Sequence, residues 1–184
     1  MGRFYALANG IAAGIAAAHL TAAPYGDEKS YPNGLAGHSG TNLIYEAAGM
    51  HASLLGCCLE SYIIDNDMLG AINRTIRGIE ITDESLSIET IRDVCIGGPS
   101  QFLGHDQTMQ LMQRDYVYPE VGDRLSPKEW NEKGRPDLLE KARARVSEIL
   151  AGPRPQHFST EVDQEIRKHY PVRLAVTDPD EVAT

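Results

Sequence analysis

The chain has 184 residues, enough for one domain with a sizeable core, and its 42% apolar and 23% charged residues are typical of globular proteins. A formal charge of -9 disfavours nucleic acid and anionic membranes as partners, because both require a basic surface. No apolar run reaches the roughly 18 residues of a membrane span, and three cysteines, two of them adjacent, form no disulfide framework, so we expect a cytoplasmic protein.

The first 40 residues show no clear hydrophobic period. Residues 4–23 are rich in Ala and Gly and fit either a loosened helix or a strand that follows a helix end. Residues 24–40, PYGDEKSYPNGLAGHSG, are dense in Pro, Gly, Asp and Asn and predict a loop. A loop of this length in a compact domain is usually functional, disordered or a sign that something is missing.

Residues 41–47, TNLIYEA, predict a short buried strand, because the apolar run lies between two glycines. Apolar residues at helical spacing then predict a helix from Met50 to residues 62–64, with Cys57 and Cys58 as small core residues. A second helix is expected from a cap at Asp65 or Asn66 to Arg77, with Gly78 as its stop.

Five further helices are expected after residue 78. Asp83 or Ser85 is the expected N-cap of a helix through Val94, and Gly97-Gly98-Pro99 breaks the chain after it. The other expected helices begin near Asp106, after Ser126-Pro127, and after Pro136-Asp137, the last of these closed by Gly152-Pro153; a short amphipathic helix covers 160–170. A mostly helical chain with one or two short strands, one feeding a helix through a Gly turn, indicates the α/β class.

The end of the 41–47 strand is the main candidate site. In α/β proteins, ligands bind at the carboxyl ends of parallel strands, and Glu46 stands at such an end. Its carboxylate suits a cationic methyl donor or acid–base work, and a salt-bridged or solvent-facing Glu is equally consistent. Tyr45 alternates with Glu46, so in a regular strand the two face opposite sides.

Other polar patterns are less specific. For His105-Asp106-Gln107 we favour a helix start with Asp106 as N-cap and His105 in the loop. Tyr116, Tyr118 and Trp130 suit a cage for a quaternary ammonium, but packing is the favoured interpretation.

The sequence predicts no metal site, no catalytic thiol and no phosphate loop. The histidines and cysteines lack zinc spacing, and no Cys-His protease or GxSxG pattern occurs. Gly97-Gly98-Pro99-Ser100 lacks the lysine of a phosphate loop, and Pro99 removes a backbone donor, so it predicts a turn.

Three blocks carry a resemblance to a known family. They are LIYEAAGMHASLLGCCLESYIIDNDMLG, RGIEITDESLSIETIRDVCIGGPSQFLGHDQTM and YVYPEVGDRLSPKEWNEKGRPDLLEKA, which together cover roughly residues 41–151. In this order they resemble the C-terminal part of the trimethylamine methyltransferase family.

The resemblance implies a TIM (β/α)8 barrel enzyme, of which this chain is the C-terminal part, predominantly helical with a few parallel strands. Such enzymes move a methyl group from a methylated or quaternary amine, of the trimethylamine or glycine betaine type, to the Co(I) corrinoid (cobalamin) of a partner protein. The absence of pyrrolysine favours the branch of the family without it. The resemblance implies Glu46 and Tyr45 as catalytic residues, and Asn42, His51, His105 and Gln107 as substrate-binding residues.

Two departures accompany the resemblance. A complete barrel takes about 250 residues, so residues 1–155 are expected to hold only the last βα units and C-terminal helices, with a helix and polar tail in 156–184. In addition, AAPYGDEKSYPNGLAG replaces a Thr-Asp-Ser-Lys-like motif of related sequences. A partial barrel leaves sheet edges uncovered, so we expect pairing with the missing N-terminal half or a second copy. The alternative is a non-catalytic remnant or interaction module.

Overall fold

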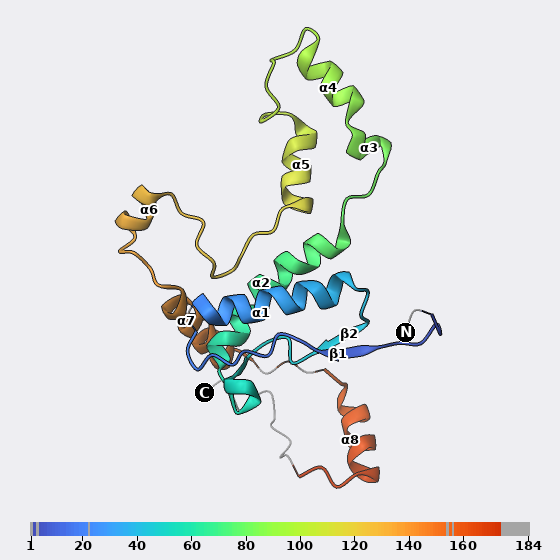
Figure 1. Ribbon diagram of the computed structural model, residues 1–184, viewed down its shortest axis with the longest axis vertical. Coiled ribbons are helices and arrows are strands. Elements are labelled where there is room, and N and C mark those ends of the chain that lie inside the picture. The colour runs from blue at the N-terminus through green and yellow to red at the C-terminus, as the bar shows by residue number, and fades with distance from the viewer. Residues whose placement is uncertain (1, 3, 22, 154, 156, 174–184) are drawn as a thin grey trace. The chain divides into compact units, whose positions relative to one another are not determined.

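A computed structural model describes residue 2 and residues 4–21, 23–153, 155 and 157–173 of the chain (Figure 1). These residues are mostly helical and include four short strands. In chain order the elements are β1 (Gly10–Ala12), α1 (Ala23–His38), β2 (Leu43–Tyr45), β3 (Met50–His51), the 3-10 turn η1 (Ala52–Leu54), β4 (Gly56–Cys57), α2 (Leu59–Arg77), α3 (Asp83–Leu86), α4 (Ile88–Cys95), α5 (Asp106–Asp115), α6 (Pro127–Glu132), α7 (Leu138–Ala151) and α8 (Thr160–His169).

The chain forms two compact units, Met1–Arg143 and Ala144–Thr184. The first unit contains all the strands above and helices α1 to α6, and the second contains most of α7 and all of α8. The expected division after residue 155, with a C-terminal helix and tail, stays a prediction.

Strands β1 and β2 form a parallel pair in which Gly10 lies opposite Leu43 and Ala12 opposite Tyr45 (Figure 1). Helix α1 connects them, so this segment is a βαβ unit, the repeat from which α/β sheets are built. The structure thus confirms a strand within residues 41–47 and a mixed, mostly helical fold. It also decides between the alternatives for residues 4–23 by placing a strand there. The expected burial of the 41–47 strand was wrong, because Leu43 and Tyr45 are exposed and Ile44 is only half-buried.

The expected loop at 24–40 was wrong, because Ala23–His38 is helix α1. Its buried residues are Tyr25, Lys29, Asn33 and Ala36, which recur at helical spacing and form one face against α2. Pro32 removes one donor from the helix interior. Packing of the buried face overrides that local signal, as tertiary context commonly does.

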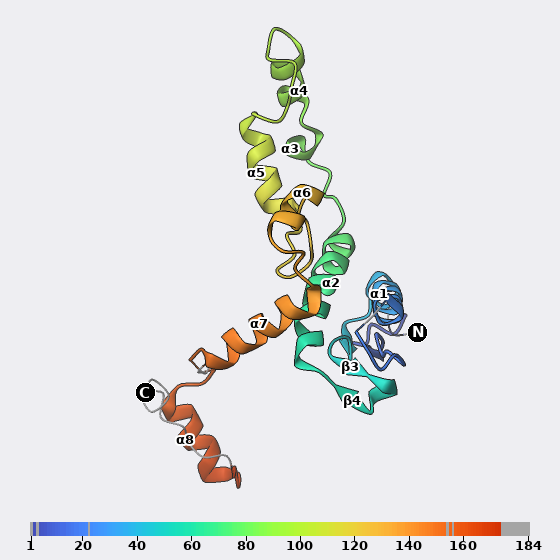
Figure 2. The same cartoon turned by 90° about the vertical axis from the view of Figure 1, so that its left-hand side faces the viewer.

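The expected helix from Met50 to residues 62–64 was also wrong at its start. Residues 50–57 form the antiparallel pair β3–β4 around η1 (Figure 2), and the helix begins only at Leu59. The cause is local backbone geometry: Ala52, Ser53 and Leu54 all have positive φ, which no right-handed helix contains. Cys57 is therefore an exposed strand residue, not a core residue, and Cys58 is the half-buried N-cap of α2.

Helix α2 runs without a break from Leu59 to Arg77, so Asp65 and Asn66 cap no second helix. Ser61 and Asp65 are one turn apart, and both are buried in the polar cluster described below. Gly78 ends the helix with a φ of 68°, as expected.

The N-caps of α3 and α5 differ from those expected, and the single helix expected through Val94 is divided into α3 and α4 at Ser87, whose φ is 55°. Thr82, rather than Asp83 or Ser85, caps α3 through a reciprocal pair of hydrogen bonds with Ser85. His105, rather than Asp106, caps α5, because its Nδ1 accepts a hydrogen bond from the amide of Gln107 at 3.2 Å.

The remaining helices agree with the sequence. Ser126 caps α6 with Glu129 as its reciprocal partner. Helices α7 and α8 lie within the expected ranges, and α8 starts from a cap at Ser159.

Buried apolar side chains are few and mostly small among the described residues. They are Ala13, Ala16, Tyr25, Ala36, Val94, Val121 and Ala142. Many large apolar side chains are exposed, among them Ile11 and Leu43 on the two parallel strands. Exposed apolar surface of this extent is typical of regions that contact other protein.

Candidate functional site

Glu46 follows β2 directly, at the carboxyl end of the parallel pair. Its φ of 71° places it in the left-handed region, so the chain leaves the strand here rather than continuing the alternation with Tyr45. Its Oε2 is buried and accepts no hydrogen bond from any residue that the structure describes. A buried carboxylate oxygen without a donor is costly, so its presence favours a partner from outside the described chain.

The segment after Glu46 concentrates backbone strain. Four non-glycine residues between positions 46 and 54 have positive φ: Glu46, Ala52, Ser53 and Leu54. Each such conformation costs on the order of 1 kcal/mol. The amides of Ala52 and Ser53 bind the carbonyls of Ala18 and Ala16, which holds the turn. Such strain clusters at ligand-binding sites and switch segments.

Asp65 of α2 ties this segment to the helices. Its Oδ2 accepts hydrogen bonds from the Gly49 amide and the Tyr25 hydroxyl, both at 2.7 Å. The Lys29 ammonium lies 3.3 Å from the same oxygen as an ion pair, and its side chain is completely buried. Two hydrogen bonds and one ion pair thus converge on one oxygen of this buried carboxylate.

His51 is the second polar residue of the cluster. Its ring stacks on Tyr25 with centroids 4.4 Å apart, and its Nε2 lies 2.6 Å from Ser61 Oγ. The Ser61 hydroxyl also lies 3.3 Å from that of Thr21. His51 Nδ1 is buried and has no hydrogen-bond partner among the described residues.

The charges of this cluster are set by burial. Burial lowers the pKa of Lys29, and the Asp65 carboxylate only partly offsets that effect. Burial also raises the pKa of Tyr25 well above its usual range, and Asp65 adds to the rise. Tyr25 is therefore a neutral donor at neutral pH, and Lys29 offsets the charge of Asp65. The carboxylate of Glu46 has no such offset among the described residues.

Gly49 is required by this geometry. Its φ is +78°, and a Cβ added to it would lie 2.3 Å from Cζ of Tyr62. We therefore expect Gly49→Ala to lower the free energy of unfolding by about 2–4 kcal/mol, through left-handed strain and overpacking. Gly70→Ala, in open space on α2, should instead raise it by about 0.5–1 kcal/mol. Urea unfolding followed by circular dichroism measures both, and equal stabilities would contradict the packing described.

Tyr45 and Asn42 lie on the same strand segment as Glu46. Tyr45 is 48% exposed, and its ring packs near Gly10 of β1. Asn42 is used in pairing: its Oδ1 accepts from the amide of Asn9 at 3.0 Å, and its own amide donates to Asn9 Oδ1 at 3.1 Å. These bonds fix the register at the start of β2.

His105 and Gln107 lie at the start of α5, and their hydrogen bonds are made to residues outside the Glu46 segment. Gln107 Nε2 donates to the carbonyl of Glu84 at 2.8 Å, and the Thr90 hydroxyl donates to Gln107 Oε1. In the described part of the chain, no hydrogen bond, ion pair or ring contact joins either residue to Glu46.

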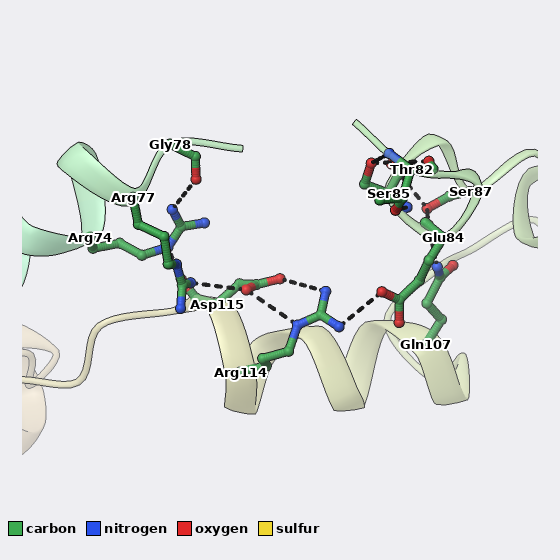
Figure 3. Close-up of polar contacts among 10 residues, drawn as sticks. All are labelled: Arg74, Arg77, Gly78, Thr82, Glu84, Ser85, Ser87, Gln107, Arg114 and Asp115. Atoms are coloured by element: carbon green, nitrogen blue, oxygen red, sulfur yellow. Dashed lines mark hydrogen bonds and ion pairs between the residues drawn. The ribbon is translucent and has the colours of Figure 1, made fainter. Parts of the chain in front are cut away.

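A second polar cluster joins the end of α2 to α3 and α5 (Figure 3). Arg114 lies between Asp115 and Glu84, with contacts of 3.2 and 2.9 Å, and Arg77 reaches Asp115 at 3.0 Å. Arg74 donates to the carbonyls of Asp115 and Gly78. A cavity of about 360 Å³ is lined by these groups and by Glu80, so three arginines meet three carboxylates and the cavity has no net charge.

This cluster predicts a pH dependence. The hydrogen bond from Arg114 lowers the pKa of Asp115 below its ordinary 3.8, and the charges of Arg114, Arg77 and Arg74 add to this. The stability it contributes is therefore present above pH 3.8 and is lost as the pH falls through the folded-state pKa. Asp115→Asn should be less stable than wild type at pH 7, with the difference shrinking below pH 4 in urea titrations. A difference that grows on acidification would contradict this.

The aromatic residues do not form a complete cage. The rings of Tyr116 and Tyr118 lie 6.4 Å apart and both are exposed. Trp130 instead faces the Arg135 guanidinium, 5.7 Å from its ring centroid.

Within the described ranges, no group of three or more His, Cys, Asp or Glu could hold a metal ion. Nor does any helix described by the structure have the length and apolarity to cross a membrane.

Sequence reasoning missed Tyr25, Lys29 and Asn33 and misread Asp65 as a cap. The available signal was the spacing of 25, 29, 33 and 36, which places these residues on one helix face. Pro and Gly in the same segment concealed it.

Comparison with known proteins decides the family. The family model for trimethylamine methyltransferase (MTTB) matches residues 1–175. The chain belongs to the trimethylamine methyltransferase family. It is 32% identical over 169 residues to trimethylamine methyltransferase MttB of Methanosarcina barkeri (strain Fusaro / DSM 804), covering 91% of this chain and 32% of that protein.

Two methyltransferases of Desulfitobacterium hafniense match as well. The chain is 26% identical to trimethylamine methyltransferase MttB of Desulfitobacterium hafniense (strain DSM 10664 / DCB-2), over 91% of its length and 33% of that protein. It is 23% identical to the glycine betaine methyltransferase of Desulfitobacterium hafniense (strain Y51), over 91% of its length and 34% of that protein. The chain thus spans about a third of the length of the curated relatives it matches.

Proposed function

We propose that this chain forms the amine-binding side of a methyltransferase that moves a methyl group from a methylated or quaternary amine to the Co(I) corrinoid of a partner protein. Family membership supports the reaction class, because the relatives are named as trimethylamine and glycine betaine methyltransferases. One observation of the structure carries the assignment to Glu46, namely its buried Oε2 without a donor among the described residues.

The fold part of the proposal is that residues 1–155 are the last βα units of a (β/α)8 barrel. The parallel β1–α1–β2 unit supports it, since such units repeat around a barrel. Barrel active sites lie at the carboxyl ends of the strands, and Glu46 follows β2 at that end.

In the proposed reaction the N–CH3 bond breaks, its electron pair stays on nitrogen, and cobalt bonds the methyl group while Co(I) becomes Co(III). The corrinoid, carried by the partner, supplies the nucleophile. Glu46 offsets the charge of the ammonium, and Tyr45 supplies a ring face to its methyl groups. His51, Asn42, His105 and Gln107 remain proposed lining residues, of which only His51 lies in the buried cluster with Asp65.

A carboxylate beside a cationic donor has a specific kinetic consequence. The positive charge on nitrogen falls as the methyl group leaves, so Glu46 stabilises the bound cation more than the transition state. Loss of its charge should therefore weaken substrate binding and should not slow the chemical step.

The test is methylation of Co(I) cobalamin with trimethylamine or glycine betaine as donor. The reaction is monitored by the loss of the Co(I) absorption. We expect turnover when the chain is combined with the N-terminal part of a full-length relative. Absence of turnover with every donor, in a mixture shown by size-exclusion chromatography to be associated, would contradict the proposal.

The alternative is an interaction module without methyl transfer. The exposed apolar side chains of β1 and β2 favour an interaction surface in either case. Amine binding separates the two, because an interaction module has no reason to bind a quaternary amine at Glu46. A monomer that unfolds cooperatively at high temperature would count against the need for a partner.

A further inference from the structure

We propose that Asp65 and Asn33 are positioning residues that hold the 46–49 turn, and with it Glu46, in its binding orientation. This inference rests on the function proposed for Glu46. The evidence is a pair of hydrogen bonds from two different helices to two peptide units of this turn, Ala47–Ala48 and Ala48–Gly49.

Asn33 of α1 holds the first of these units. Its Nδ2 donates to the carbonyl of Ala47 at 3.1 Å, and its side chain is completely buried. The same amide group packs against Gly14, where an added Cβ would lie 2.2 Å from Nδ2. Gly14 follows β1 with a φ of +76°, so the side chain that holds the turn is itself wedged against the neighbouring strand end.

Asp65 of α2 holds the turn at Gly49. It accepts from the Gly49 amide at 2.7 Å, while the Gly49 carbonyl accepts from the amide of Cys58 at 3.2 Å. Gly49 is therefore bound on both sides and covered by the Tyr62 ring. The left-handed conformation of Glu46 persists because the peptides after it are fixed from outside.

Lys29 has a separate task in this arrangement. Its ammonium pairs with Asp65 and so offsets the charge of the carboxylate that binds the Gly49 amide. Asp65 therefore has a counter-ion, whereas the Oε2 of Glu46 has no partner among the described residues. A cation entering the site is directed to Glu46 rather than to Asp65.

The chain offers a matched control on the same helix. Asp67 lies two residues beyond Asp65, and its carboxylate also accepts backbone hydrogen bonds, from the amides of Glu120, Val121 and Gly122 at 2.7–2.9 Å. Asp67 thus has the same chemistry as Asp65 but holds a different segment.

The experiment compares four proteins: wild type, Lys29→Met, the double variant Lys29→Met/Asp65→Leu, and Asp67→Leu. The double variant replaces the buried ion pair by apolar groups, which commonly preserves folding, and it removes the acceptor for Gly49. Hydrogen exchange of single amides by NMR reports on the turn, and calorimetric titration with tetramethylammonium reports on the site.

We expect the Gly49 amide to exchange at least about 10-fold faster only in the double variant, with affinity for tetramethylammonium about 10- to 100-fold weaker. Lys29→Met should leave Gly49 protected and the affinity unchanged or higher, because a cation is removed. Asp67→Leu should speed exchange at the amides of Glu120, Val121 and Gly122 and leave the Gly49 amide protected.

Two results would overturn the inference: Gly49 protection equal in wild type and double variant, or faster exchange with unchanged affinity. Asn33→Leu gives a second test, since it removes the bond to Ala47 and should also weaken binding. Wild-type protein that binds no amine would overturn the proposed function of Glu46, while the exchange data still decide whether Asp65 holds the turn.

Discussion

Glu46→Gln should raise the KM for the amine about 10- to 100-fold and leave kcat unchanged or higher, because Glu46 stabilises the bound cation more than the transition state. The expected size is that of a charge-assisted contact in a site with little water, about 1.5–3 kcal/mol. The change keeps the shape of the side chain and removes its charge. Steady-state kinetics of Co(I) methylation, together with calorimetric titration of the amine, measure both parameters.

Two controls separate loss of charge from loss of fold. Glu140→Gln removes the same unit of charge at an exposed position of α7 and should change neither parameter. Glu46→Gly relieves the left-handed strain, so it should be at least as stable as wild type within about 0.5 kcal/mol and still lose affinity. A kcat that falls with KM unchanged would contradict the role of Glu46 as a ground-state partner of the cation.

Asp65→Ala should lower the free energy of unfolding by about 3–5 kcal/mol, because it leaves the buried Lys29 ammonium without a partner. The Gly49 amide and the Tyr25 hydroxyl lose their acceptor as well. Lys29→Met should cost less, since Asp65 keeps two hydrogen bonds. Urea unfolding at pH 7 gives both values.

The double variant Lys29→Met/Asp65→Ala provides the check on this ranking. If the ion pair is the cause, its cost should be well below the sum of the two single changes. Additive costs, or an Asp65→Ala cost below about 1 kcal/mol, would show that the pair contributes little to the fold.

The sequence predicted those elements whose local signals agree with their packing. The strand at 41–47, Gly78 as a stop, the Ser126 cap and helices α7 and α8 are of this kind. It failed where packing opposes local preference. Residues 24–40 contain Pro32 and several glycines, yet the buried face of Tyr25, Lys29 and Asn33 against α2 holds them as a helix.

The sequence predicted only part of the candidate site. Glu46 could be singled out from its position after a strand, but Asp65, 19 residues later, could not be connected with it. Asp65 bonds the Gly49 amide, three residues after Glu46, and the left-handed residues 52–54 then turn the chain into β3 and β4 instead of a helix. Nothing in Ala-Ser-Leu encodes that geometry locally, because none of the three favours positive φ.

The most direct measurement of the role of Glu46 is an NMR titration of the wild-type chain, labelled at its glutamate carboxyl carbons, with glycine betaine and with trimethylammonium. We predict a saturable shift of the Glu46 carboxyl resonance and of the Gly49 amide, absent from Glu46→Gln. Saturable binding that leaves Glu46 unperturbed, or binding that is equal in Glu46→Gln, would contradict the assignment of this carboxylate as the amine site.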